Sequence, residues 1–151
     1  MRKLYLLLLI LFLIYWGCEY EQDTTPTEVT LWGEVYSVED TDTLYLSGNE
    51  LTGSIPSEIG NLTNLRYLNL NDNELTGSIP PETGNLTHLT YLNLKSNQLS
   101  GIIPEEICNI GDSTPSLSNN QFCPPYPSCI ENMDSFWFDI SVGVQDTTNC
   151  N

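Results

Sequence analysis

Residues 68–80 are Leu-Asn-Leu-Asn-Asp-Asn-Glu-Leu-Thr-Gly-Ser-Ile-Pro, and nearly the same stretch occurs 24 residues earlier and 24 residues later. The earlier copy, residues 44–56, is Leu-Tyr-Leu-Ser-Gly-Asn-Glu-Leu-Thr-Gly-Ser-Ile-Pro; the later copy, residues 92–104, is Leu-Asn-Leu-Lys-Ser-Asn-Gln-Leu-Ser-Gly-Ile-Ile-Pro. A fixed period of this length indicates a repeat architecture. One unit cannot bury its own leucines, so each unit has to stack on the next.

Each repeat begins with a short alternation of apolar and polar residues. Leu68 and Leu70 point to one side and Tyr67, Asn69 and Asn71 to the other, which predicts a short strand with one buried face. Stacking places such strands side by side, about 4.8 Å apart, as a parallel sheet. An amide at the end of each strand can satisfy buried backbone groups of adjacent turns, which predicts a ladder of Asn49, Asn73, Asn97 and Asn120.

The second half of each repeat carries the residues of a tight turn and a short helical piece. Glycine at residues 53, 77 and 101 is expected where the chain needs a positive φ. The prolines that follow are expected to open a short helical turn, with a glutamate two residues later in its first turn. Gly60 and Gly84 are expected to close that turn.

The pattern Leu-x-x-Leu-x-Leu-x-x-Asn-x-Leu-x-Gly-x-Ile-Pro resembles the leucine-rich repeat, in the 24-residue subtype known from plant receptors and inhibitor proteins. The resemblance covers residues 43–110. It implies an α/β solenoid: right-handed, slightly curved, with three full repeats plus caps and short parallel strands on the concave face. In this family the concave face usually binds proteins or other polymers.

The repeats depart from the pattern at three places. Thr83 stands where Ile59 and Ile107 place an apolar group, and a buried hydroxyl costs about 1–2 kcal/mol unless it finds a partner. Cys108 replaces the turn-closing glycine. After Ile110 the register fails, and only residues 117–122 return as a partial fourth strand.

The register brings three rows of side chains to the concave face. Tyrosine beside asparagine and serine offers rigid aromatic area and adaptable hydrogen bonds, a composition suited to recognition of a protein or polysaccharide. The alternative is that this face is merely polar and solvated. The predicted binding residues are Thr43, Tyr45, Ser47, Tyr67, Asn69, Asn71, Tyr91, Asn93 and Lys95.

The charge balance argues against nucleic acid as a partner. The chain has a formal net charge of −16, and removal of residues 1–17 leaves two basic and 20 acidic residues, a charge of −18. Contacts to phosphates need lysine and arginine. An acidic surface keeps the chain soluble and favours cationic partners.

The N-terminus has the features of an export signal. Met1-Arg2-Lys3 is basic, and Leu4 to Trp16 is an uncharged run too short to span a membrane comfortably. Gly17-Cys18 resembles a bacterial lipoprotein signal, which implies lipidation of Cys18, an exported protein and membrane attachment through the lipid. Ordinary secretion and a retained anchor are alternatives. The expected organisation is a signal peptide (1–17), a disordered tether (18–28), an N-terminal cap (29–42), the repeats (43–110) and a C-terminal cap with the partial repeat (111–151).

Four cysteines lie beyond Cys18 and indicate two disulfides in an exported chain. Advancing Cys108 by one turn leads to about position 131, close to Cys129, which favours Cys108–Cys129 with Cys123–Cys150. The rival pairing is Cys108–Cys123 with Cys129–Cys150. A zinc site is the sharper alternative, but the spacing is not that of paired Cys-x-x-Cys ligands.

The sequence offers no catalytic constellation. His88 is the only histidine, and the acidic pairs, such as Glu105-Glu106, lack the spacing of a calcium loop. We therefore expect no enzyme activity, no metal and no cofactor. The sequons at Asn61 and Asn85 are part of the repeat consensus and are read as structural.

These observations predict a non-catalytic cell-surface binding module, anchored to the cell envelope or secreted. A structural envelope or spacer lipoprotein without a specific ligand is the first alternative. A secreted inhibitor or defence protein of the plant type is the second. The sequence does not define the ligand or the oligomeric state.

Overall fold

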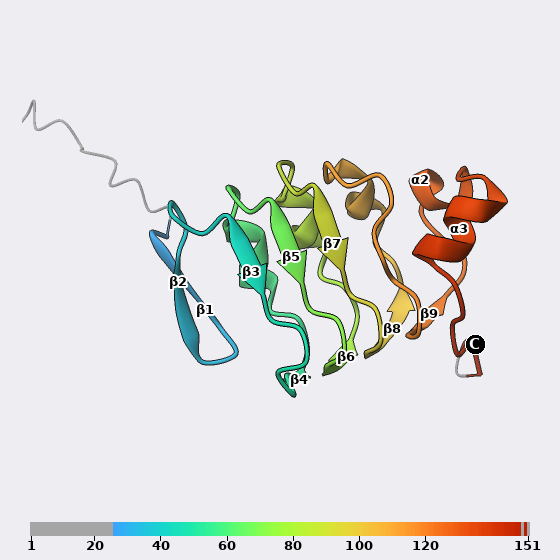
Figure 1. The fold of residues 1–151 in the computed structure, drawn as a ribbon, viewed down its shortest axis with the longest axis horizontal. Coiled ribbons are helices and arrows are strands. Elements are labelled where there is room, and N and C mark those ends of the chain that lie inside the picture. Colours follow the sequence, from blue (N-terminus) through green and yellow to red (C-terminus); the bar gives the residue numbers. More distant parts are fainter. Residues whose placement is uncertain (1–25, 149, 151) are drawn as a thin grey trace, which may run out of the picture.

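The computed structural model describes residues 26–148 and residue 150, and Figure 1 shows that they form an elongated stack of turns. The predictions for the signal peptide, for Cys18 and for most of the tether therefore lie outside the described residues. The domain boundaries stay predictions. No helix in residues 26–148 is long and apolar enough to cross a membrane.

The three predicted strands form one parallel sheet. The strands are β3 (Thr43–Tyr45), β5 (Tyr67–Asn69) and β7 (Tyr91–Asn93), and they pair in the order β3-β5-β7. Leu44 lies opposite Leu68, and Leu68 opposite Leu92. The register equals the repeat period, so equivalent residues stack directly on one another. This is a leucine-rich-repeat solenoid, as the repeats predict.

A second parallel sheet lies in the half of each repeat that we expected to hold only turns and helical pieces. Its order is β4-β6-β8-β9, formed by Thr52–Gly53, Glu74–Gly77, Gln98–Ile102 and Gln121–Cys123. Leu75 and Leu99 are buried on these strands while their neighbours Thr76 and Gln98 are exposed. The same period of two that marks the first sheet is present here over only a few residues.

Three 3₁₀ helices complete the turns: η1 (Ser57–Asn61), η2 (Pro81–Asn85) and η3 (Glu105–Asn109). The expectation that the repeat prolines occupy the first helical position is wrong. Pro56, Pro80 and Pro104 are extended and precede the helices as N-caps. The glutamates lie in the first turn as expected.

The glycines of these helices have a different role from the one predicted. Gly60 and Gly84 lie inside η1 and η2, not after them, and neither has a positive φ. A Cβ on Gly60 would lie 2.4 Å from the carbonyl oxygen of Glu82, and one on Gly84 would lie 2.5 Å from that of Glu106. Glycine is required because adjacent helices touch there.

The core runs along the stack between the sheets and the helices, built from the repeat leucines and isoleucines. Thr83 is 3% exposed, in the slot that Ile59 and Ile107 fill in the adjacent turns. Its hydroxyl has no hydrogen-bond partner among the described residues. Thr83 therefore departs from the apolar pattern as expected, and it buries a hydroxyl that has no partner among the described residues.

Three of the four predicted asparagines form a ladder. Asn73 accepts from the backbone N–H groups of Asn49 and Leu51 and donates to the carbonyls of Leu46 and Leu70. The side chains of Asn97 and Asn120 continue the ladder one and two turns later, each accepting from one backbone N–H and donating to two buried carbonyls. Asn49 is an exception. Its side chain is exposed and donates only to the Ser47 carbonyl, because no earlier repeat supplies backbone groups for it.

An antiparallel hairpin precedes the first repeat, in the segment expected to cap the stack. It consists of β1 (Glu28–Leu31) and β2 (Glu34–Ser37), joined by Trp32 and Gly33 at φ 47° and 88°. Positive φ at both turn residues matches the twist of a two-residue hairpin. Val29 and Leu31 are buried, and β1 packs beside η1. Trp32 packs against the core, and its Nε1 is buried without a partner among the described residues.

The C-terminal segment continues the stack further than the sequence indicated. Residue 116 bridges to Asn93 and residue 117 bonds to the carbonyl of Ser141, so two more layers follow the third repeat. Gln145 supplies another rung of the ladder: it accepts from the N–H of Phe122 and donates to the carbonyls of Leu117 and Val142. A positive φ recurs in one slot of every turn, at Gly48, Asp72, Ser96, Asn119 and Gly143.

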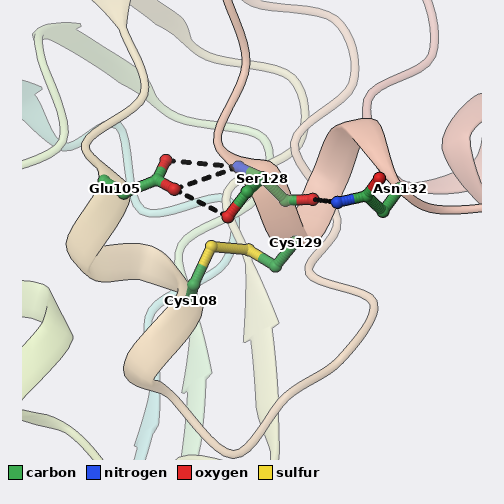
Figure 2. The surroundings of a disulfide bond; sticks show 5 residues. All are labelled: Glu105, Cys108, Ser128, Cys129 and Asn132. Atoms are coloured by element: carbon green, nitrogen blue, oxygen red, sulfur yellow. Dashed lines mark hydrogen bonds between the residues drawn. A yellow bond between two sulfur atoms is a disulfide. The ribbon is translucent and has the colours of Figure 1, made fainter.

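Two short helices and two disulfides close this end: α2 (Ser128–Glu131) and α3 (Ser135–Ser141). Cysteine pairs as the register favours, Cys108 with Cys129 and Cys123 with Cys150. Figure 2 shows that the first disulfide joins η3 to α2 beside Glu105, whose carboxylate accepts from the N–H and the hydroxyl of Ser128. At the position equivalent to Gly60 and Gly84, the next element is α2. Cys108 is tolerated there because its side chain forms a disulfide with Cys129 of α2.

Candidate functional site

The sheet β3-β5-β7 turns its leucines inward and a mixed aromatic and polar surface outward. We call this surface the strand face; it comprises Thr43, Tyr45, Ser47, Tyr67, Asn71, Tyr91, Asn93 and Lys95. Each strand supplies outward positions because successive side chains alternate. All nine predicted binding residues lie on or next to this sheet, and eight of them expose part of their surface.

Asn69 is the exception, since it is only 5% exposed. Its Oδ1 accepts from the N–H of Asn71, two residues later. Asn93 occupies the same slot one turn on, with Oδ1 accepting from the N–H of Lys95 and Nδ2 donating to the hydroxyl of Tyr91. The prediction that the Asn69 side chain contacts a ligand is therefore wrong, because the side chain is buried and its Oδ1 is bonded to the backbone at the end of its own strand.

Three tyrosines form a continuous aromatic stack. The rings of Tyr67 and Tyr91 are 4.3 Å apart and nearly parallel, at 2°. Tyr45 lies 6.4 Å from Tyr67, tilted by 18°. Tyr45 comes from a different slot of its repeat, so it meets Tyr67 diagonally across the sheet. Tyr45 is 66% exposed, which leaves the N-terminal end of the stack open to solvent.

The environment of the stack raises the pKa of Tyr67. Burial raises the pKa of Tyr67 above its ordinary value, and a hydrogen bond with Tyr91 raises it further. Since a tyrosine is protonated at neutral pH even at its ordinary pKa, the Tyr67 hydroxyl can both donate and accept a hydrogen bond there.

The two basic residues of the described chain flank these tyrosines. Lys95 follows β7 and is exposed; Arg66 immediately precedes β5 and is exposed too. The sequence analysis placed Lys95 on this face but left out Arg66. The signal that could have identified Arg66 is its position immediately before Tyr67, just outside the short strand β5.

The strand face has no arrangement for catalysis. His88 lies elsewhere, with Nδ1 3.2 Å from the carbonyl oxygen of Thr63. Within the described residues, no group of three or more His, Cys, Asp or Glu side chains is placed to hold a metal ion. A cavity of about 420 Å³ lies at the N-terminal hairpin, lined by residues 26–28, 37–39 and Asn64, away from the tyrosines.

Comparison with known proteins points to one repeat type. The profile described as "Leucine Rich repeats (2 copies)" matches residues 42–77 and 63–105. A search of curated proteins finds no match.

Solved structures of plant receptors are similar to this chain. The plant peptide hormone receptor RGFR1, solved in complex with RGF2, is 42% identical, with a TM-score of 0.59 over 63% of this chain and 15% of that chain. The ectodomain of the Arabidopsis receptor kinase HAESA, in complex with an extended IDA peptide hormone, is 40% identical, with a TM-score of 0.61 over 68% of this chain and 17% of that chain. The present chain thus spans a small part of these receptors.

A shorter relative matches over more of its length. A chain from the BIR3–SERK2 complex of Arabidopsis thaliana is 26% identical, with a TM-score of 0.58 over 87% of this chain and 82% of that chain.

Proposed function

We propose that this chain, whose plant-type leucine-rich repeats are similar to those of plant receptor ectodomains, is a non-catalytic extracellular module that binds a peptide or protein segment on its strand face. The observation that carries the proposal is the stack of Tyr45, Tyr67 and Tyr91 beside the partly exposed amides of Asn71 and Asn93 and the exposed Lys95. Tyrosine gives contact area at low entropic cost, and amides adapt their hydrogen bonds to a partner.

The geometry of the stack favours a peptide over a polysaccharide. Sugar rings are held against the flat faces of aromatic side chains. Tyr67 lies between its two neighbours, 4.3 Å from Tyr91 and 6.4 Å from Tyr45, so it presents mainly its edge and its hydroxyl to a ligand, whereas Tyr45 at the open end of the stack is largely exposed. Peptide groups provide donors and acceptors that suit phenol hydroxyls and amides. Polysaccharide recognition is the alternative outcome of the test below.

The complexes in which similar structures were solved agree with this ligand class. RGFR1 and HAESA were each solved with a peptide hormone, and the shorter relative comes from a complex of BIR3 with SERK2. The proposed contact residues are those of the strand face together with Arg66 at its rim. The proposed alternative of a secreted inhibitor or defence protein uses the same surface.

Export of the chain is part of the proposal, and so is the question of its attachment through a lipid. Two disulfides in a chain of this size are typical of an exported protein. Attachment through a lipid on Cys18 rests on the sequence alone, and the similarity to plant receptors adds no support for it. Mass spectrometry of the N-terminal peptide decides between acylated Cys18 and a chain that begins beyond it.

The binding test compares the wild type with a variant that carries both Tyr67→Ala and Tyr91→Ala. Each is used to select from a displayed library of random peptides and to probe an array of polysaccharides. We expect peptides to be enriched by the wild type and to lose affinity by about tenfold or more for the variant. A matched control, Ile102→Ala, removes an exposed apolar side chain from β8 and should bind like the wild type.

Three results separate the alternatives. Equal peptide binding by the tyrosine variant sinks the strand face as the site. Binding to polysaccharides alone replaces the ligand class. A wild type that selects nothing favours a spacer protein without a ligand.

A further inference from the structure

Helix α3 exposes two large aromatic side chains at the C-terminal end of the stack. Phe136 is 64% exposed and Trp137 is 45% exposed, and their rings meet edge to face with centroids 5.3 Å apart. Figure 1 shows α3 as the outermost element of this end. Each ring covers part of the other, and the rest of the pair is largely open to solvent.

The pair is not needed to attach the helix. Phe138, on the same helix, is partly buried and lies edge to face with Tyr126 at 5.7 Å. Val142 is buried at the end of the helix, and the Ser141 hydroxyl donates to the carbonyl of Pro115. These contacts hold α3 on the stack. Exposed Phe136 and Trp137 therefore have no packing role that would explain them.

Two carboxylates lie next to the aromatic pair on the same helix. Oδ1 of Asp134 accepts from the N–H of Trp137 at 3.0 Å, so it lies beside that residue. Asp139 is three residues after Phe136 on the helix, which places the two on one side of it. Glu131 on α2 is exposed too, but its Oε1 accepts from the N–H of Tyr126, so it adds negative charge to this end of the chain without facing the rings. The sequence contains no lysine or arginine after Lys95, so this end of the chain has nothing to neutralise these charges.

This pattern selects the chemistry of a partner. Two copies of the chain that meet through this surface would bring carboxylates against carboxylates, and the N-terminal hairpin is acidic too. An anionic membrane surface is repelled for the same reason. A basic side chain, in contrast, can pair with the carboxylates and lie over an aromatic ring.

We propose that Phe136 and Trp137, with Asp134 and Asp139 beside them on α3, form a docking surface for a basic and apolar segment of a partner protein. Leucine-like side chains of the segment pack on the aromatic pair, and its arginines pair with the carboxylates. The surface is separate from the strand face: it lies on α3 and its N-cap residue, and it shares none of that face's residues.

The test uses the full disulfide-bonded chain and two synthetic peptides with leucines at the same positions. One peptide carries arginine at the remaining positions and the other carries glutamate. Affinity is measured by fluorescence anisotropy of the labelled peptides. The double variant Phe136→Ser/Trp137→Ser changes only exposed side chains, and retained circular dichroism checks its fold.

We expect the arginine peptide to bind the wild type and to lose about tenfold in affinity for this double variant. The control Val35→Ser removes an apolar side chain of similar exposure from the N-terminal hairpin and should leave the affinity unchanged. Asp139→Asn should weaken binding more than Glu74→Gln, which removes one exposed charge on β6. The Tyr67→Ala/Tyr91→Ala variant should bind normally, which separates this surface from the strand face.

Unchanged affinity for Phe136→Ser/Trp137→Ser would mean that the peptide is held by net charge alone, and would overturn the proposal; so would an equal loss for Phe136→Ser/Trp137→Ser and Val35→Ser. So would binding of the glutamate peptide with equal affinity. Sedimentation provides the other decisive result: self-association of the wild type that the double variant abolishes would identify a second copy as the occupant.

Discussion

Thr83→Val is the most direct test of how this core is built. The side chain lies in η2, and its hydroxyl is buried without a partner among the described residues. Leaving a buried hydroxyl unpaired costs about 1–3 kcal/mol by mutational measure. Valine replaces the hydroxyl with a methyl group of similar size, and the two residues have nearly the same helix propensity. We therefore expect the free energy of unfolding to rise by about 1–2 kcal/mol.

The assay is equilibrium unfolding in urea with both disulfides intact, followed by tryptophan fluorescence. Trp32 and Trp137 lie near opposite ends of the stack, so a single transition reports on the whole domain. The midpoint should rise without a change in slope, because the surface exposed on unfolding is the same. The melting temperature should rise by roughly 3–6 °C per kcal/mol for a domain of this size.

The control is Thr87→Val, which makes the same chemical change at an exposed residue just after η2. Its effect should stay within about 0.5 kcal/mol of zero, as for most surface substitutions. An unchanged or lower stability of Thr83→Val would refute the reasoning, since it would mean that the hydroxyl has a partner in solution. Thr83→Ile, which copies the adjacent turns, tests whether the slot also has room for one more methylene.

Three further predictions concern the stack. Asn97→Ala should lower the free energy of unfolding by about 3–5 kcal/mol, because it leaves several buried backbone groups unpaired, whereas Asn49→Ala should change it by less than about 0.5 kcal/mol; equal effects in urea unfolding would contradict the ladder. Gly84→Ala should cost about 1–3 kcal/mol in the same assay, because its Cβ would collide with the carbonyl of the next helix. Replacement of Cys108 and Cys129 by serine opens a loop with a sequence separation of 21 and should cost about 3 kcal/mol; a stability unchanged under oxidising conditions would show that the bond adds no constraint.

The first sheet and the amide ladder could be predicted because both depend on the repeat period alone. Once equivalent residues stack, Leu68 must lie beside Leu44 and Leu92, and Asn97 must meet the backbone of the turn before it. The second sheet was missed because its strands include Gly53, Gly77 and Gly101, which were assigned to turns because glycine permits a positive φ.

The extent of the stack could not be predicted, because the C-terminal layers keep the geometry of the repeat but not its residue types or their spacing. Gln145 follows Asn120 by 25 residues, and its amide is one methylene longer than that of asparagine. The extra reach lets it serve the N–H of Phe122 from a backbone with different spacing. A search for asparagine in register passes over it.

The candidate site divides in the same way. The rows of the strand face follow from the register, but the contact between Tyr45 and Tyr67 depends on the directions of side chains from different slots. The burial of Asn69 depends on the hydrogen bond it makes at its own strand end.

The sequence by itself determined the repeat, the parallel register, the acidic character of the surface and the favoured cysteine pairing, because each follows from spacing or composition. Only the tertiary structure decided where the stack ends, which polar side chains stay accessible and which aromatic rings touch. Those properties depend on contacts between turns, and a contact of one side chain with the next layer has no counterpart in the spacing of residues along the chain.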